Sequence, residues 1–151
     1  MDIIAAVMDF SAELDAPCDA PTLFRWVDDL ARYPDWLSIV PRAEATDEAD
    51  TWSIDLRGRI GPLARSKRLR MVRTRHDPPT TAVFERDERD GQEHSSWVLR
   101  VEVIPESEGS RLVMHLHYGG RLWEPLVERL LRDEIDASKA RLLALIAAEA
   151  R

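Results

Sequence analysis

Residues 121–151 read RLWEPLVERLLRDEIDASKARLLALIAAEAR, and their pattern predicts one long C-terminal helix. At 100° per residue, the apolar side chains collect on one broad side, while charged residues such as Glu128, Arg132 and Asp136 collect on the other. A helix of about 28 residues spans roughly 42 Å. Because such a helix needs a large apolar partner, we expect it to pack on the strand-rich middle of the chain. The apolar side comprises Leu122, Trp123, Leu126, Val127, Leu130, Leu131, Leu142 and Leu145.

The middle of the chain, residues 42–118, reads as a series of strands joined by short turns. Turn-forming pairs such as Gly61-Pro62, Asp90-Gly91 and Glu108-Gly109 separate the later strands. Sequential strands with short connections predict an antiparallel meander. We predict strands near 42–47, 51–60, 63–75, 80–87, 94–104 and 110–118.

The N-terminal segment predicts a strand followed by two short helices. Residues 7–15 alternate between apolar and polar side chains, which is typical of a half-buried strand. Asp19 is a suitable N-cap and Pro21 suits the first helical turn, so a helix is predicted from there to about Ala31. Tyr33-Pro34 should end it, and residues 35–40 are predicted to form a second short helix before Pro41.

The predicted meander has one apolar and one charged face, which indicates a curved antiparallel sheet with solvent on its outer side. We therefore expect an α+β protein in which the long C-terminal helix covers the inner face. The inward residues are Trp52, Ile54, Leu56, Leu69, Met71, Ala82, Phe84, Arg86, Trp97, Leu99, Val101, Val103, Leu112, Met114, Leu116 and Tyr118.

Two segments carry a resemblance to a known superfamily. Residues 23–30 read LFRWVDDL and are followed by Tyr33-Pro34-Asp35-Trp36-Leu37, and residues 142–145 read LLAL near the C-terminus. The chain resembles the START-like, polyketide cyclase-like superfamily called SRPBCC. This resemblance implies the helix-grip fold, with about seven strands wrapped on the C-terminal helix, and a single ligand-binding domain over residues 1–151. Members include lipid carriers, aromatases, cyclases and proteins without a known ligand, so the fold does not determine the function.

Composition excludes several classes of protein. With a net charge of −7, the chain lacks the basic excess of a general nucleic-acid binder, so we predict no nucleic-acid partner. Cys18 is the single cysteine, so neither an internal disulfide nor a thiolate metal cluster is expected. The N-terminus lacks a basic region before its apolar residues, and no apolar run approaches the length of about 18 residues of a membrane span. We expect a cytoplasmic protein with no membrane span.

The helix-grip resemblance implies a cavity between sheet and helix, and such cavities are mostly apolar with a few orienting polar groups. We predict that its wall is formed by Trp52, Ile54, Leu69, Met71, Phe84, Arg86, Trp97, Leu99, Met114, Leu116, Tyr118, Trp123, Val127, Leu130, Glu134 and Ser138.

Three polar residues in this set are candidate catalytic groups. Glu134 lies in the middle of the apolar side of the C-terminal helix, where a carboxylate must be paired, protonated or hydrated. It either faces the cavity, with Ser138 and Arg141 at helical spacing, or pairs at the helix edge with an arginine of the sheet. Arg86 and Tyr118 could bind a carbonyl or carboxylate of a ligand, or could reach water near the sheet end. An Arg86–Glu134 pair would combine both readings.

Two further patterns have a structural explanation. His115 and His117 have the spacing of metal ligands, yet they should face outward because their neighbours face inward, so no metal site is predicted. Residues 56–76 contain eight basic residues and no acid. The acid-rich segments before and after it indicate charge matching between adjacent strands rather than anion binding.

We therefore consider three functions. The first is binding of a hydrophobic small molecule, such as a lipid or a polyketide-like compound, between sheet and helix. The second is an aromatase or cyclase that uses Glu134, Arg86 and Tyr118 as acid, base or orienting groups. The third is a non-catalytic protein-interaction module in which the cavity is collapsed and the outer face or the basic hairpin (residues 56–76) binds a partner. The chain has no G-x-S-x-G, Walker, G-x-G-x-x-G or H-E-x-x-H motif, and no cofactor is predicted.

Overall fold

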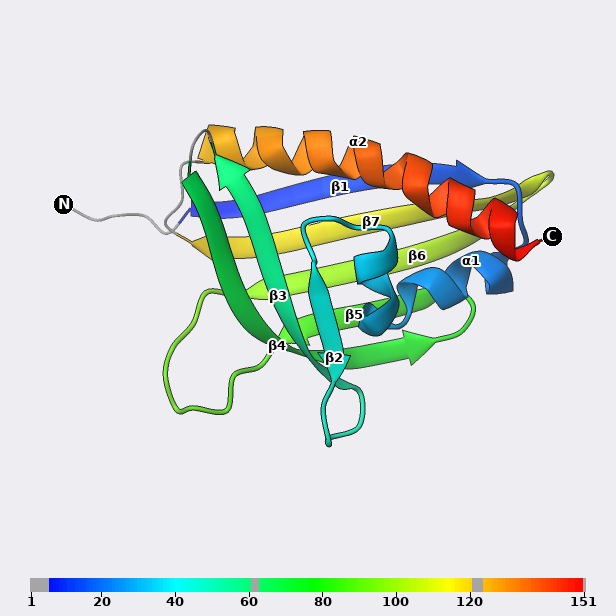
Figure 1. Cartoon of the computed structure of the whole chain (residues 1–151). Helices are drawn as coiled ribbons and strands as arrows, with labels where there is room; N and C mark the ends of the chain where they lie inside the picture. Colours follow the sequence, from blue (N-terminus) through cyan, green and yellow to red (C-terminus); the bar gives the residue numbers. More distant parts are fainter. Residues whose placement is uncertain (1–5, 61–62, 121–123, 151) are drawn as a thin grey trace.

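A computed structural model gives the structure of the protein. It describes residues 6–60, 63–120 and 124–150, and it describes their side chains except for those of residues 6–8, 59, 60, 63–65, 120 and 124–131. The elements follow in the order β1 (Ala6–Ala16), α1 (Ala20–Val27), the 3-10 helix η1 (Leu30–Asp35), β2 (Arg42–Ala45), β3 (Thr51–Ile60), β4 (Leu63–Asp77), β5 (Thr81–Arg86), β6 (Trp97–Glu106), β7 (Gly109–Gly120) and α2 (Glu124–Glu149) (Figure 1).

The seven strands form one antiparallel sheet with the order β1-β7-β6-β5-β4-β3-β2, so the predicted meander is confirmed, and β1 adds to its end beside β7. The register aligns apolar residues across neighbouring strands. Leu116 of β7 pairs with Phe10 of β1 on one side and with Leu99 of β6 on the other, and Leu99 pairs with Phe84 of β5. Because aligned residues share a face of the sheet, this row forms part of a continuous apolar inner surface.

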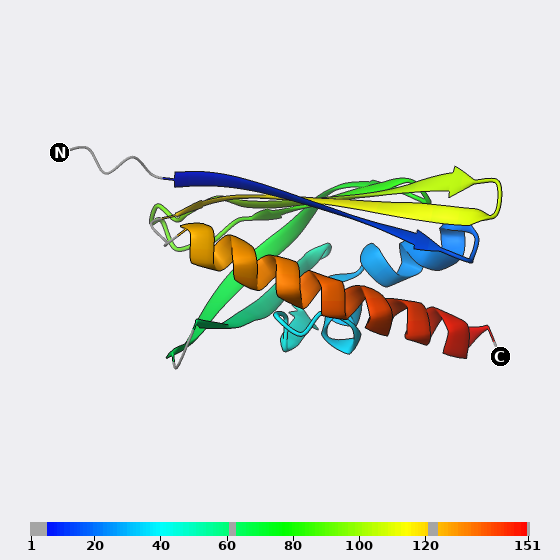
Figure 2. The ribbon, with the colours of Figure 1, turned by 90° about the horizontal axis from the view of Figure 1, so that it is seen from above.

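The helix α2 lies along the inner face of the curved sheet and approaches both β1 and β3. Figure 2 shows α2 beside the layer formed by β1, β7 and β6, while β3 and β4 turn out of that layer toward the helix. Leu142 and Ile146 of α2 are buried in the shared core. The predicted helix-grip α+β fold is therefore confirmed.

The two short helices follow the first strand as predicted, but their bounds differ. The chain does not continue as one helix to Ala31, because Asp28 ends α1 and the carboxylate of Asp29 accepts a hydrogen bond from the N–H of Ala31, which starts η1. Tyr33 and Pro34 lie inside η1 rather than between two helices. The predicted helix over residues 35–40 was wrong, because Asp35 ends η1 and residues 36–40 form a loop with turns.

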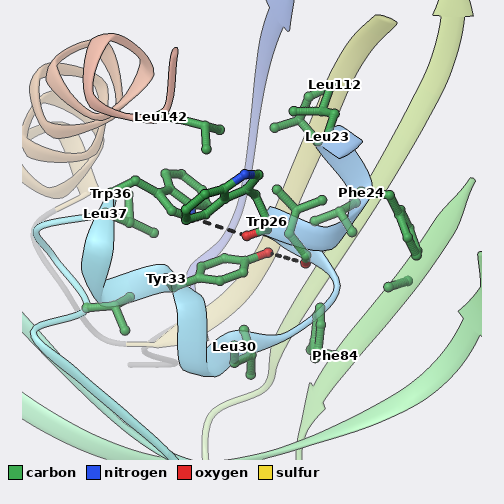
Figure 3. Packing of buried hydrophobic residues seen from close by; sticks show 14 of the residues in the cluster. Leu23, Phe24, Trp26, Leu30, Tyr33, Trp36, Leu37, Phe84, Leu112 and Leu142 are labelled. Carbon is green, nitrogen blue, oxygen red and sulfur yellow. Dashed lines mark hydrogen bonds between the residues drawn. The ribbon is translucent and has the colours of Figure 1, made fainter. Parts of the chain in front are cut away.

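The core beneath α1 and η1 combines aromatic rings with leucine side chains (Figure 3). The Tyr33 hydroxyl donates to the Val27 carbonyl at 2.8 Å, and the Trp36 indole N–H donates to the Trp26 carbonyl at 3.2 Å. These bonds satisfy polar groups that would otherwise be buried without a partner. The ring of Phe84 lies edge-on to Tyr33. The sheet and both short helices therefore share one core.

The outer face of the sheet is charge-matched, as predicted. Arg68 Nε lies 2.8 Å from Asp55 Oδ1 on the adjacent strand, and Arg70 Nη2 lies 2.7 Å from Glu48 Oε2. The hydrogen bond from Arg68 holds the pKa of the Asp55 carboxyl below its ordinary value. Arg68 and Arg70 of β4 thus find acids on neighbouring segments, which accounts for this part of the basic pattern without an anion.

The two histidines of β7 face outward, which confirms the orientation predicted for them. His117 Nδ1 and His115 Nε2 lie 2.8 Å and 3.0 Å from the same oxygen of Asp9 on β1. Their hydrogen bonds lower the pKa of the Asp9 carboxyl, with the largest contribution from His117. The pair therefore crosslinks the outer surfaces of β1 and β7.

Gly109, which opens β7, is required by its backbone conformation and its surroundings. Its φ angle is +143°, and an added Cβ would overlap with the carbonyl oxygen of Ala16 at the end of β1. Because both effects oppose a side chain, we expect Gly109→Ala to lower the free energy of unfolding by about 1–3 kcal/mol. Urea unfolding measures this. Gly91→Ala is the matched control, since its φ is also positive but no atom lies within 4 Å of the added Cβ. Equal losses for the two variants would contradict the role of the Ala16 contact.

Candidate functional site

A cavity of about 120 Å³ lies between the inner face of the sheet, α2, and the segment from η1 to β2. Strands β1, β3, β4, β6 and β7 provide its floor, and η1 with the following loop provides one side. The described wall consists of Phe10, Ala12, Glu13, Leu14, Leu30, Tyr33, Trp36, Leu37, Ile39, Val40, Ile54, Leu56, Leu69, Met71, Trp97, Leu99, Leu112, Met114, Leu116, Ile135, Ser138, Lys139 and Leu142.

Half of the residues predicted for the cavity lie in this wall. Seven of them come from alternate positions of β3, β4, β6 and β7, where the period of two turns every second side chain inward, and the eighth comes from α2. The members present are Ile54, Leu69, Met71, Trp97, Leu99, Met114, Leu116 and Ser138. Their contact with a ligand stays a prediction.

The other predicted residues have different positions. Phe84 lies on the same inner face of the sheet but is fully buried beside Tyr33 and Trp52, and Trp52 donates its indole N–H to Asp29 at 3.1 Å. Tyr118 stacks on Trp97 with 4.7 Å between ring centroids, so it lies behind a wall residue. The described wall does not include Arg86 or Glu134 either. Trp123 and the side chains of Val127 and Leu130 lie outside the described residues.

Three polar residues of α2, Glu134, Ser138 and Arg141, hold the loop after η1 in place. The Ser38 hydroxyl donates to the Glu134 carboxylate, and the Arg141 Nε donates to the Trp36 carbonyl at 3.2 Å. The buried Ser138 donates to the Glu134 carbonyl at 2.6 Å and accepts from Arg141 at 3.1 Å. Glu134 thus meets a loop hydroxyl rather than a sheet arginine. Together these bonds fasten the loop that forms one wall of the cavity to the helix that covers it.

The suggested pair between Arg86 and Glu134 is not formed. Arg86 Nη2 instead lies 3.8 Å from Glu88 Oε2, and its Nη1 donates to the Ser95 carbonyl at 3.2 Å. The strand β5 ends at Arg86, and its side chain meets residues of the segment that follows this strand. The two candidate groups therefore belong to separate clusters.

Sequence reasoning missed the part of the wall that comes from β1 and from the loop after η1. Phe10, Ala12 and Leu14 were on the apolar side of the first predicted strand, and this alternation was the available signal for them. The loop residues Ile39 and Val40 had no such signal, because their segment was predicted as helix. Their contribution depends on how the loop folds back over β3.

Among the described wall residues, the polar side-chain atoms of Tyr33, Ser138 and Lys139 are engaged, whereas the buried indole N–H of Trp97 has no hydrogen-bond partner. The Tyr33 hydroxyl donates to a backbone carbonyl, and burial raises the pKa of its phenol well above the ordinary value. The Ser138 hydroxyl is bonded on both sides, and Lys139 Nζ lies 3.6 Å from Asp136. In the residues that the structure describes, no group of three or more metal-ligating side chains comes together. The described wall can therefore enclose apolar groups, and it leaves the Trp97 indole N–H as an unpaired hydrogen-bond donor, which is not a general acid or base.

The fold and the cavity define a helix-grip protein in which a sheet and a long helix enclose an apolar space. A sequence model described as "Polyketide cyclase / dehydrase and lipid transport" matches residues 8–147. The chain belongs to this family. Membership supports a ligand-binding or cyclase-type role at the level of the family.

Solved structures show the same fold at low sequence identity. The Zhui aromatase/cyclase from Streptomyces sp. R1128 is 10% identical with a TM-score of 0.69, and the match covers 97% of each chain. The protein TTHA0849 from Thermus thermophilus is 18% identical with a TM-score of 0.71, covering 95% of this chain and 100% of the other. A START superfamily protein from Mycobacterium smegmatis is 15% identical with a TM-score of 0.66, covering 94% and 97%. A search of curated proteins found no significant match.

The helices were also compared with the requirements of a membrane span. Within the described part of the chain, neither α1 nor α2 is both long and apolar enough to cross a bilayer.

Proposed function

We propose that the protein binds a hydrophobic small molecule in the cavity between its sheet and α2. The observation that carries this proposal is an apolar space that the fold leaves open although close packing is the rule in protein interiors. The family description, which includes lipid transport, supports the same role. The fastened loop between η1 and β2 gives the cavity a defined wall, which favours binding over collapse.

The size of the cavity limits the ligand. Pockets for drug-sized ligands usually measure about 300–1,000 Å³, whereas the cavity here measures about 120 Å³. An apolar cavity of about 150 Å³ is known to hold one benzene ring. We therefore infer that the enclosed part of the ligand is a single ring or a short acyl chain, either as a whole molecule or as the end of a longer one.

Cyclase activity is the second candidate. It is favoured by the family description and by the fold shared with an aromatase/cyclase. However, cyclisation and dehydration need an acid or base beside the substrate, and Tyr33, Ser138 and Lys139 of the described wall are engaged elsewhere. Glu134 would have to exchange its bond with Ser38 for a substrate. Binding without turnover therefore ranks first.

The direct test is a titration of the isotope-labelled protein with octan-1-ol and with toluene, followed by NMR. We expect saturable shifts of the methyl signals of Leu99, Met114 and Leu116, because these side chains line the cavity. Val113, on the outer face of the same strand, serves as the internal control. Absence of saturable shifts with a series of apolar compounds would overturn the proposal. Shifts confined to the outer face would instead support the interaction module.

A further inference from the structure

One end of the cavity adjoins a cluster of cationic side chains. Trp97 and Met71 line the cavity, and Arg86 pairs with Met71 across β4 and β5 on the same inner face of the sheet. The Lys67 ammonium lies 5.9 Å from the centroid of the Trp97 ring. Trp97 is stacked on Tyr118 on the next strand. The apolar cavity therefore ends at an aromatic wall with two cations beside it.

Ser95 joins the two cations. Arg86 Nη1 donates to its hydroxyl oxygen at 3.2 Å, and Lys67 Nζ donates to the same oxygen at 3.1 Å. Arg86 is held rigidly, since only 8% of its side chain is exposed and its Nη2 also lies 3.3 Å from His94 Nδ1. Two cations thus donate hydrogen bonds to one hydroxyl oxygen. Because the hydroxyl is neutral, it neutralises neither positive charge.

Among the side chains that the structure describes, the acids of the cluster do not balance its charge. Glu88 is the carboxylate that lies within 4 Å of Arg86, and its other oxygen already accepts the backbone N–H of Arg70 at 2.7 Å. Asp90 is bound to His94 at 2.8 Å rather than to either cation. Burial lowers the pKa of the Lys67 ammonium, and the nearby Arg86 lowers it further. The described side chains therefore give two cations and one shared carboxylate, and their local charge is positive.

Two buried donors at this end also lack an acceptor. Neither the Arg86 Nε–H nor the Trp97 Nε1–H forms a hydrogen bond within the described structure. Leaving a buried donor without a partner costs about 1–3 kcal/mol, more when it is charged. Such a cost is understandable where a ligand supplies the acceptor. Both donors belong to residues at the same end of the cavity, and Trp97 forms part of its wall.

We propose that this end of the cavity binds the carboxylate of an apolar monocarboxylate, whose chain or ring fills the cavity. The proposal rests on the proposed ligand-binding function and names its ligand class. The carboxylate would accept hydrogen bonds from Arg86 and the Trp97 indole, with Lys67 adding a charge at the rim. Arg86 offers its free Nε–H to the ligand, because its Nη atoms are already bonded to Ser95 and His94, and hydrogen bonds between charged groups are stronger than those between neutral groups. The cavity volume then selects short or single-ring acids.

The test compares ligands that share an eight-carbon chain and differ in the head group. Octanoate, octan-1-ol and octylammonium are titrated near neutral pH, and binding is followed by NMR as above. Hydrogen bonds to charged groups contribute about 1.5–3 kcal/mol, so octanoate should bind about ten- to a hundredfold more tightly than octan-1-ol. Octylammonium should bind most weakly. Equal affinities for octanoate and octan-1-ol would overturn the carboxylate site while leaving the proposed function intact, whereas no binding by either would overturn both.

Variants distinguish a ligand site from a purely structural cluster. Arg86→Met should reduce the octanoate preference to about threefold or less and leave the octan-1-ol affinity unchanged, and Arg86→Lys should restore part of the preference. If Arg86→Met does not fold, Lys67→Met carries the test, because Lys67 is exposed; it should lower the octanoate affinity about two- to fivefold. Arg57→Met is the matched control, since it removes the same charge from the outer side of the neighbouring strand. An unchanged preference in the cluster variants, or an equal loss in the control, would overturn the proposal.

Discussion

Replacement of Phe84 by alanine is expected to lower the free energy of unfolding by about 3–5 kcal/mol. Its side chain is 0% exposed, and its ring lies edge-on to Trp52 at 5.6 Å and to Tyr33 at 6.5 Å between centroids. Truncation would remove the buried ring and leave a space that β5 cannot fill, since the strand is paired on both sides. Because domains are stable by only about 5–15 kcal/mol, this single change would consume a large part of the total.

Urea unfolding followed by tryptophan fluorescence measures the loss. Phe84→Leu should cost less than about 2 kcal/mol, since most of the buried volume remains. Ile104→Ala on the same sheet is the exposed control, because 45% of that side chain is accessible, and it should change stability by about 0.5 kcal/mol or less. A loss below about 1 kcal/mol for Phe84→Ala would contradict its place in the core. The prediction from the sequence that Phe84 lines the cavity would then be favoured instead.

The overall fold was predictable because it follows from local periodicity. The alternation of apolar and polar residues gave the strands, and turn signals such as Asp90-Gly91 marked their separation. The apolar side shared by many residues of the segment 121–151 predicted the helix that covers the sheet. These patterns recur over many residues, so a small error at one position does not change the result. The START-like resemblance added the way in which sheet and helix combine.

The short helices show where local reasoning fails. Asp28 and Asp29 are adjacent acids, and either could begin or end a helix. In the structure Asp28 ends α1, while Asp29 caps η1 and also accepts the indole N–H of Trp52 from β3. The second contact is between residues far apart in the sequence. The helix boundary is therefore influenced by packing on the sheet, which the local sequence does not contain.

The cavity wall was predictable on the sheet and unpredictable elsewhere. Strand alternation placed Leu99, Met114 and Leu116 on the inner face, and all three line the cavity. Strand alternation also placed Phe84 on the inner face. It could not show whether the side chain there lines the cavity or is covered by other aromatic rings. The bonds of Glu134 and Arg86 depend on Ser38 and Ser95, which lie in irregular segments. Such polar partners can be predicted only when the path of the loop is known, and local periodicity does not give that path.

Leu116→Trp is expected to block the cavity and abolish most of the binding of octan-1-ol. Leu116 lines the cavity from the middle of β7, between Phe10 and Leu99 on the adjacent strands. An indole at this position would occupy space that the ligand needs. Losing about 60 Å² of apolar contact costs about 1.5 kcal/mol at 25 cal/mol per Å², which weakens binding at least about tenfold. The NMR titration described above measures the affinity.

Stability separates a blocked cavity from a damaged fold. The larger side chain enters space that is empty in the ligand-free protein, so the free energy of unfolding of Leu116→Trp should fall by less than about 2 kcal/mol. Val113→Trp is the matched control, because Val113 faces outward on the same strand and pairs with Glu102. It should leave the affinity unchanged. Retained binding in Leu116→Trp, with a folded protein, would mean that the apolar ligand binds outside the cavity, and the carboxylate site next to Trp97 would then lose the chain-binding space on which it depends.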